Sequence, residues 1–181
     1  MKIHTRQRKN AMLKLMGGFS LLETLVALAI LNAAILGPIN LAYISIRSAS
    51  LSHNITTAAF LAEEGVELAR SQREKNIYSG NNWLTVLIDC TVDSPCRIAT
   101  VADGEIEIVP CGGLCAPLKY DSVTGLYWYE SGNASIFTRT FTIDEITENK
   151  EAKITITVSW KERFLGGVQN VQLESRLFNW H

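Results

Sequence analysis

The chain has 181 residues, of which 47% are apolar, and this length allows one long helix and one modest domain. Its 17 basic and 18 acidic side chains give a formal net charge of −1. Residues 1–18 contain five of the basic residues and no acid, so the rest of the chain has twelve basic and eighteen acidic side chains, a net charge of −6. Net charge therefore gives no support for nucleic-acid binding.

A basic leader and a long uncharged segment make up the N-terminal third. The basic residues of the leader are Lys2, Arg6, Arg8, Lys9 and Lys14. Beyond Glu23 no charged residue occurs until Arg47, a gap of 23 residues. As a helix with a rise of about 1.5 Å per residue this gap is roughly 34 Å long, which is enough to cross a bilayer. The leader's positive charge predicts that it stays on the cytoplasmic side while the rest is translocated.

The junction between leader and apolar segment is Gly17-Gly18-Phe19-Ser20-Leu21-Leu22-Glu23. This motif resembles the N-terminus of type IV prepilins and of the pseudopilins of type II secretion. The resemblance implies that a prepilin peptidase cuts between Gly18 and Phe19 and that the new N-terminal Phe19 is methylated. It also implies that Glu23 is the glutamate that acts in filament assembly. An ionisable residue at the start of such a segment is expected to be functional, because its burial in lipid is costly without a partner.

Two other interpretations of the N-terminus are open. A secretory signal peptide also has a basic start and an apolar core, and Ala27-Leu28-Ala29 fits its small-residue cleavage site. The apolar core before that site would be short and would contain Glu23, and apolar residues continue long after it. An ordinary single-span anchor explains the length of the segment but neither the paired glycines nor Glu23.

The expected helix runs from Phe19 to about Glu74. Residues 19–46 form its transmembrane and assembly part, and residues 47–75 form an amphipathic part that packs on a domain. Pro38, which follows Gly37, predicts a kink or a melted turn; many major pilins carry their proline two residues further along. The charged residues between Glu63 and Lys75 are expected to form a solvated face with ion pairs within the helix.

Four cysteines, Cys90, Cys96, Cys111 and Cys115, are expected to form two disulfides in an exported domain. Three connectivities are possible, and we favour the local pairs Cys90–Cys96 and Cys111–Cys115, each of which closes a short loop. The rival interpretation is a zinc site with four cysteine ligands, but the spacings differ from those of common zinc ribbons.

Residues 76–181 are expected to form a loop-rich, disulfide-bearing antiparallel β domain. Short strands are expected at 84–88 and 105–109, and a further strand at Tyr127-Trp128-Tyr129, whose aromatic rings are expected to pack in the core. Longer strands are expected at 136–143, 152–160 and 168–178, joined as a meander by turns at 144–151 and 165–167. Strict alternation over 153–160 indicates a half-buried strand. The fold class is therefore α+β, with the second half of the long helix packed on an antiparallel sheet, as in pilins.

No pattern of catalytic or cofactor-binding residues is present. His4, His53 and His181 are widely separated and have no metal-binding spacing, and the chain lacks a phosphate-binding loop and a nucleophile elbow. We therefore expect no enzyme activity, no cofactor and no metal.

The resemblance implies a pilin or pseudopilin subunit. The short acid-rich meander, which ends in Phe178-Asn179-Trp180-His181, resembles that of minor subunits more than that of major ones. The expected partners of the chain are the prepilin peptidase, other pilin subunits, the assembly platform of the inner membrane, and membrane lipid. Its expected location is the inner membrane, as a single-span precursor, and then an extracytoplasmic filament. The alternatives are a membrane-anchored β domain that binds a ligand or sugar without polymerising, and an exported enzyme whose anchor is misinterpreted.

Overall fold

The computed structural model describes residues 18, 20–101, 103–162 and 166–180. The chain divides into two compact units, 1–45 and 46–181. Residues 1–17 of the leader, with Gly17, and the expected N-terminal residue Phe19 lie outside the described residues. The elements are the helix α1 (Leu21–Tyr78) and the strands β1 (Cys96–Thr100), β2 (Ile106–Pro110), β3 (Lys119–Tyr120), β4 (Tyr127–Trp128), β5 (Asn133–Ala134), β6 (Phe137–Thr147), β7 (Glu151–Lys161) and β8 (Val168–Phe178).

The helix α1 continues through Pro38 without a break, so the melted turn is wrong, and the kink stays a prediction. Proline removes one backbone donor, which costs the hydrogen bond to the carbonyl four residues earlier. The helix nevertheless continues as one element of 58 residues. It also extends four residues beyond the expected end at Glu74.

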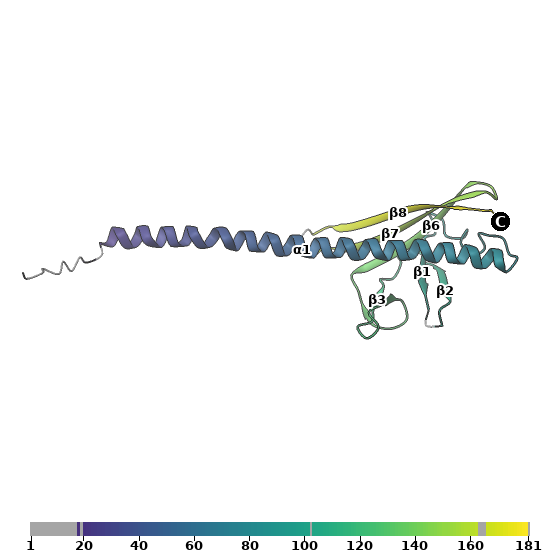
Figure 1. Ribbon diagram of the computed structural model, residues 1–181, viewed down its shortest axis with the longest axis horizontal. Coiled ribbons are helices and arrows are strands. Elements are labelled where there is room, and N and C mark those ends of the chain that lie inside the picture. Colours follow the sequence, from purple (N-terminus) through teal and green to yellow (C-terminus); the bar gives the residue numbers. More distant parts are fainter. Residues whose placement is uncertain (1–17, 19, 102, 163–165, 181) are drawn as a thin grey trace, which may run out of the picture. The chain divides into compact units, whose positions relative to one another are not determined.

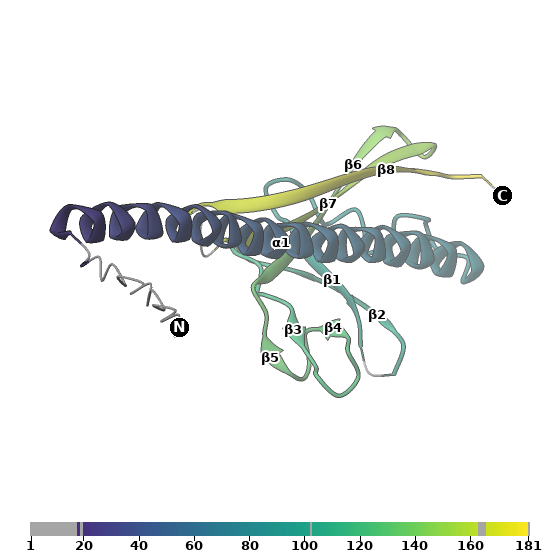
Figure 2. The same cartoon turned by 60° about the vertical axis from the view of Figure 1, so that its left-hand side comes forward.

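The strands of residues 46–181 form two antiparallel sheets. The larger sheet has the order β2-β1-β6-β7-β8, and the smaller one has the order β4-β3-β5. As expected, β6, β7 and β8 form a meander, and both pairings extend over almost the full length of the strands. The expected turn at 144–151 is shorter, because β6 continues to Thr147 through a shift of register after Glu145. Figures 1 and 2 show the C-terminal half of α1 running across the larger sheet.

A stripe of small and apolar residues on α1 packs against this sheet. Its buried members are Ala58, Leu61, Ala62, Gly65, Val66 and Ala69. The strands contribute the alternate, buried residues of β7, among them Ile154, Ile156 and Val158. The helix approaches the sheet closely at Gly65, where an added Cβ would lie 3.0 Å from Cγ2 of Ile156. The α+β fold, with the long helix packed on an antiparallel sheet, is therefore as predicted.

The segment expected as a strand at 84–88 forms tight turns instead, so this prediction is wrong. The N–H groups of Leu87 and Ile88 both donate to the carbonyl of Leu84, and Val86 has a positive φ of 70°. The buried Asn76 side chain donates to the carbonyls of Trp83 and Thr85, which holds the turns against the end of α1. These local bonds satisfy backbone groups that a strand would pair across a sheet.

Both disulfides join near neighbours in sequence. Cys90 is bonded to Cys96 and Cys111 to Cys115, which is the pairing favoured above. All four thiols are therefore consumed, and the alternative zinc site with four cysteine ligands is wrong. Cys90 and Cys96 are fully buried in the core, so their disulfide ties the turns after α1 to the start of β1.

Candidate functional site

The start of α1 is fixed by local hydrogen bonds of Ser20. The backbone N–H of Glu23 donates to Oγ of Ser20 at 3.2 Å, and the N–H of Thr24 donates to the Ser20 carbonyl at 3.2 Å. Ser20 is therefore the N-cap, with Glu23 three residues later as in a capping box. A carboxylate in the first turn also interacts favourably with the helix dipole. The cap thus positions Glu23, whose side chain is exposed, at the first turn of α1.

A largely apolar surface follows the cap. None of the described residues between Leu21 and Ser45 is buried. Fourteen large apolar side chains are exposed between positions 21 and 46: Leu21, Leu22, Leu25, Val26, Leu28, Ile30, Leu31, Ile35, Leu36, Ile39, Leu41, Tyr43, Ile44 and Ile46. By length and composition α1 is able to cross a membrane. An apolar surface of this size marks contact with lipid or with other protein.

The few polar side chains of this segment bond to the helix itself. Thr24 Oγ1 donates to the Leu21 carbonyl at 2.9 Å. The side-chain amides of Asn32 and Asn40 donate to the carbonyls four residues earlier, at 2.9 and 3.0 Å. Such bonds lower the cost of placing these groups in an apolar environment. Glu23 differs, because it is the only acidic or basic residue between positions 20 and 46.

The residues expected at the cleavage site are described only in part. Gly18 is exposed, and a Cβ added to it would meet no atom within 4 Å. Its small size is therefore not required by packing against the described residues. Gly17 and Phe19 lie outside the described residues, and the structure describes no contact between Glu23 and the amine that cleavage would create at Phe19.

Sequence reasoning missed a buried arginine, Arg139 on β6. Its side chain is fully buried. One guanidinium nitrogen donates to the Leu61 carbonyl at 3.0 Å and to Glu64 Oε2 at 2.9 Å, and the other donates to the Ile98 carbonyl at 2.6 Å. Arg139 thus joins α1, β1 and β6. The sequence held a signal for it, because Arg139 alternates with the core residues Phe137 and Phe141.

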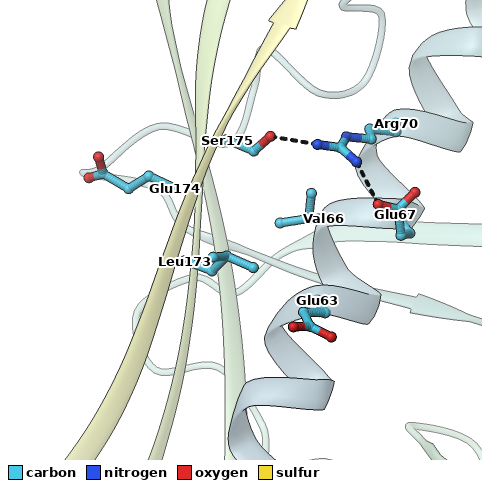
Figure 3. A pocket seen from close by; sticks show the side chains of 7 residues that line it. All are labelled: Glu63, Val66, Glu67, Arg70, Leu173, Glu174 and Ser175. Carbon is cyan, nitrogen blue, oxygen red and sulfur yellow. Dashed lines mark hydrogen bonds and ion pairs between the residues drawn. The ribbon is translucent and has the colours of Figure 1, made fainter.

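The charged residues between Glu63 and Lys75 only partly match the expected solvated face. Arg70 pairs within the helix with Glu67 at 2.6 Å, as expected. The same guanidinium also donates to Ser175 Oγ on β8 at 3.0 Å (Figure 3). Glu64 bonds to the buried Arg139, and Lys75 pairs with Glu105 before β2. Much of this cluster therefore connects the helix to the sheet.

The aromatic residues at Tyr127–Tyr129 pack mainly inward, as expected. Tyr127 and Tyr129 lie against the core, and Tyr127 makes an edge contact with Phe137 at 6.0 Å between ring centroids. Burial raises the pKa of Tyr129 above its usual value, although the nearby Arg139 and Arg97 partly oppose this shift. Burial, with a smaller contribution from Tyr120, also raises the pKa of Tyr127. These rings contribute to packing.

No cluster of at least three metal-ligating side chains occurs among the described residues. The strongest functional feature of the described chain is therefore the capped start of α1, with Glu23 followed by the apolar surface. No protein-family model, no curated protein and no solved structure matches the chain.

Proposed function

We propose that this chain is a minor pilin or pseudopilin, a subunit of a type IV pilus or of a type II secretion-like filament. The observation that supports this proposal most is the first turn of α1, where Ser20 caps the helix and Glu23 precedes the exposed apolar surface. A plain membrane anchor needs the apolar surface but has no use for a carboxylate at its start, since an unpaired charge in lipid is costly.

In this proposal the precursor is a single-span protein of the inner membrane. The basic leader remains in the cytoplasm, and the disulfide-bonded domain lies outside it, where cysteines oxidise readily. A prepilin peptidase removes residues 1–18 and methylates Phe19. An inner-membrane assembly platform then transfers the subunit from lipid into the filament, which extends outside the cytoplasm. The subunit carries out no catalysis and needs no cofactor.

Within the filament, α1 packs among the helices of other subunits. The carboxylate of Glu23 accepts hydrogen bonds from the positively charged amine of Phe19 in a neighbouring subunit. Burying an ion costs several kcal/mol, and the pairing offsets that cost only when both groups meet in good geometry. The pair therefore selects one axial register of neighbouring helices more than it adds net stability.

Processing is the first test. Intact-mass analysis of the membrane-extracted protein should show loss of eighteen residues and addition of one methyl group. Gly18→Val should keep the leader, because the proposed peptidase needs a small residue at this position, and it should still insert into the membrane. The domain of this variant should unfold normally, since no atom of the described residues lies within 4 Å of a Cβ added at Gly18. Full-length wild-type protein in the membrane would contradict the proposal and favour a simple anchor.

Glu23 is the second test. Glu23→Leu should insert and be cleaved, because the apolar segment is unchanged, but its incorporation into filaments should fall sharply. Glu23→Asp should have a partial effect, because the shorter side chain withdraws the charge from the amine. The measurement is the ratio of subunit in sheared filaments to subunit in membranes. Equal incorporation of Glu23→Leu and wild type would favour the alternative, a membrane-anchored β domain that binds a ligand or sugar without polymerising.

A further inference from the structure

Two asparagines interrupt the apolar segment in the first half of α1. Asn32 and Asn40 are both exposed, and the residues around them are almost entirely apolar. At a rise of about 1.5 Å per residue, Asn32 lies roughly 12 Å beyond Thr24, and Asn40 lies roughly 9 Å before Ile46. In a membrane-spanning helix both amides therefore fall within the hydrocarbon core, which is about 30 Å thick. An amide without a hydrogen-bond partner is costly there.

The helix itself satisfies only part of each amide. The Nδ2 group of Asn32 donates to the Leu28 carbonyl at 2.9 Å, and that of Asn40 donates to the Leu36 carbonyl at 3.0 Å. A side-chain amide has two N–H donors and one carbonyl acceptor. One N–H and the Oδ1 atom of each asparagine consequently have no partner within the described residues. In an apolar environment these groups need a partner from outside the chain.

The two amides lie on one side of α1. Their separation of eight residues places them about 80° apart around the helix axis and about 12 Å apart along it. Glu23 is about 180° from Asn32 and about 100° from Asn40, so it lies on a different side. Ala29 lies between the asparagines in angle, and its small side chain allows another helix to approach closely. We call this side the amide face; it consists of Ala29, Asn32, Ala33, Leu36 and Asn40.

A second copy of the chain is the partner that complements the amide face. An asparagine amide both donates and accepts hydrogen bonds, so an identical asparagine is its complement. Two copies that span one membrane in the same orientation are parallel, and both hold Asn32 and Asn40 at the same depths. Equivalent asparagines therefore meet at both depths without any further requirement on the sequence. A lipid chain offers no hydrogen bond, and a different protein would need its own polar groups at both depths.

Two asparagine pairs also select one arrangement of the helices. A slip in register, or a third helix, would leave amides against apolar side chains, which is costly in hydrocarbon. The pairs at positions 32 and 40 lie about 12 Å apart, so both form only when the helices are parallel and in register.

We propose that this chain forms a parallel homodimer in the membrane through the amide face. The free N–H of one asparagine donates to Oδ1 of its equivalent in the second copy, at position 32 and at position 40. The dimer requires neither cleavage of the leader nor Glu23, so it does not rest on the proposed function. It concerns the chain in the membrane, whether or not that chain later enters a filament.

The first test measures dimerisation of the full chain with its leader intact, purified from cells without the proposed peptidase. Sedimentation equilibrium in density-matched detergent micelles gives the dissociation constant of the dimer. Asn32→Leu and Asn40→Leu should each raise this constant about fivefold, and the double variant about twentyfold or more. Asn32→Gln and Asn40→Gln keep an amide on a longer side chain, and each should stay within about threefold of wild type.

The second test locates the interface without changing the asparagines. Ala29→Cys places a thiol on the amide face, whereas Ala27→Cys places the same thiol about 160° away around the helix axis. All four native cysteines are consumed in disulfides, so the introduced thiol is the only free one. Oxidation in membranes should link Ala29→Cys chains into dimers and leave Ala27→Cys chains largely monomeric.

Three results would overturn the proposal. The first is a monomeric chain in micelles, or no cross-linking at position 29 in membranes. The second is a double asparagine variant that dimerises as tightly as wild type, or equal cross-linking at positions 27 and 29, because either would place the interface elsewhere. The third is a trimer or a larger species as the main form, which would assign the amides to a bundle. None of these results changes the tests of cleavage and filament incorporation, so the two proposals fail separately.

Discussion

Arg139→Met tests whether the buried arginine holds α1 to the two strands beside it. Methionine keeps most of the length and apolar volume of the side chain but removes all of its hydrogen-bond donors. Three acceptors lose their partner: the carbonyls of Leu61 and Ile98, and the carboxylate of Glu64. The variant should fold, because the apolar contacts of the site remain, and its free energy of unfolding should be lower.

The magnitude follows from what each acceptor does next. The Leu61 carbonyl lies within α1 and keeps its helical bond, and the Glu64 side chain is 41% exposed, so water replaces the guanidinium there. The Ile98 carbonyl is left without its donor, and a buried unsatisfied acceptor costs about 1–3 kcal/mol. Releasing a buried charge offsets part of this loss. We expect a net loss of about 2 kcal/mol.

Glu64→Leu should cost about as much, because it leaves the buried guanidinium of Arg139 without its counterion. The double variant carries neither charge of this pair and should be more stable than the sum of the single losses by about 1 kcal/mol or more. Urea unfolding in detergent, followed by the fluorescence of the buried Trp83 and Trp160, measures all four free energies. Additivity within about 0.5 kcal/mol, or an unchanged single variant, would refute this account.

Three further predictions concern the domain. Gly132→Ala should lower the free energy of unfolding by about 2–4 kcal/mol, because φ is +99° and the added Cβ would lie 2.5 Å from the Tyr120 carbonyl oxygen. Gly80→Ala, where φ is +71° and the added Cβ meets no atom within 4 Å, should lower it by about 1 kcal/mol. Equal losses in the two variants would contradict the close contact at Gly132. Replacing both cysteines of the 90–96 disulfide by alanine should cost about 2 kcal/mol in chemical unfolding, and a loss under about 0.5 kcal/mol would contradict a constraining role. Because burial raises the pKa of Tyr129, this side chain ionises at a lower pH in the unfolded chain than in the folded one. The free energy of unfolding should therefore fall as the pH rises above about 10, and Tyr129→Phe should make this fall less steep. An equally steep fall in Tyr129→Phe would assign the pH dependence to other groups.

The long elements could be predicted because their burial follows one regular period. In β7 every second residue from Ala152 to Trp160 is buried, which matches the alternation in the sequence. The second half of α1 likewise buries residues at helical spacing. In both elements, packing against a single neighbouring layer decides which side chains are apolar, so a local pattern is sufficient.

The misses occur where a tertiary contact overrides the local pattern. The segment 84–88 contains β-branched and apolar residues, but the amide of Asn76 fixes it as turns with Leu84 and Leu87 buried on one side. Strand β1 was not predicted because it is short and contains a charged residue, Arg97. The Cζ of Arg97 lies 5.0 Å from the centroid of the Tyr129 ring. Arg139 was missed although it alternates with the core residues Phe137 and Phe141. Its polar partners come from distant elements that the local sequence does not reveal.

The two halves of α1 differ in whether their apolar side chains are covered by the described chain. Residues 58–69 bury their apolar stripe against the sheet of the same chain, whereas the fourteen large apolar side chains at 21–46 have no cover within the described chain. At about 1.5–3 kcal/mol for each buried side chain, their exposure to water would cost more than the whole domain gains by folding. Lipid and a bundle of apolar helices remove this cost almost equally, because both environments are apolar. The charged group of this segment, Glu23, does distinguish them, since the hydrocarbon of a bilayer offers no cation to its carboxylate, whereas in the proposed filament the N-terminal amine of a neighbouring subunit would. The fate of Glu23 variants therefore distinguishes a lipid anchor from an assembly helix more sharply than any change to the apolar residues.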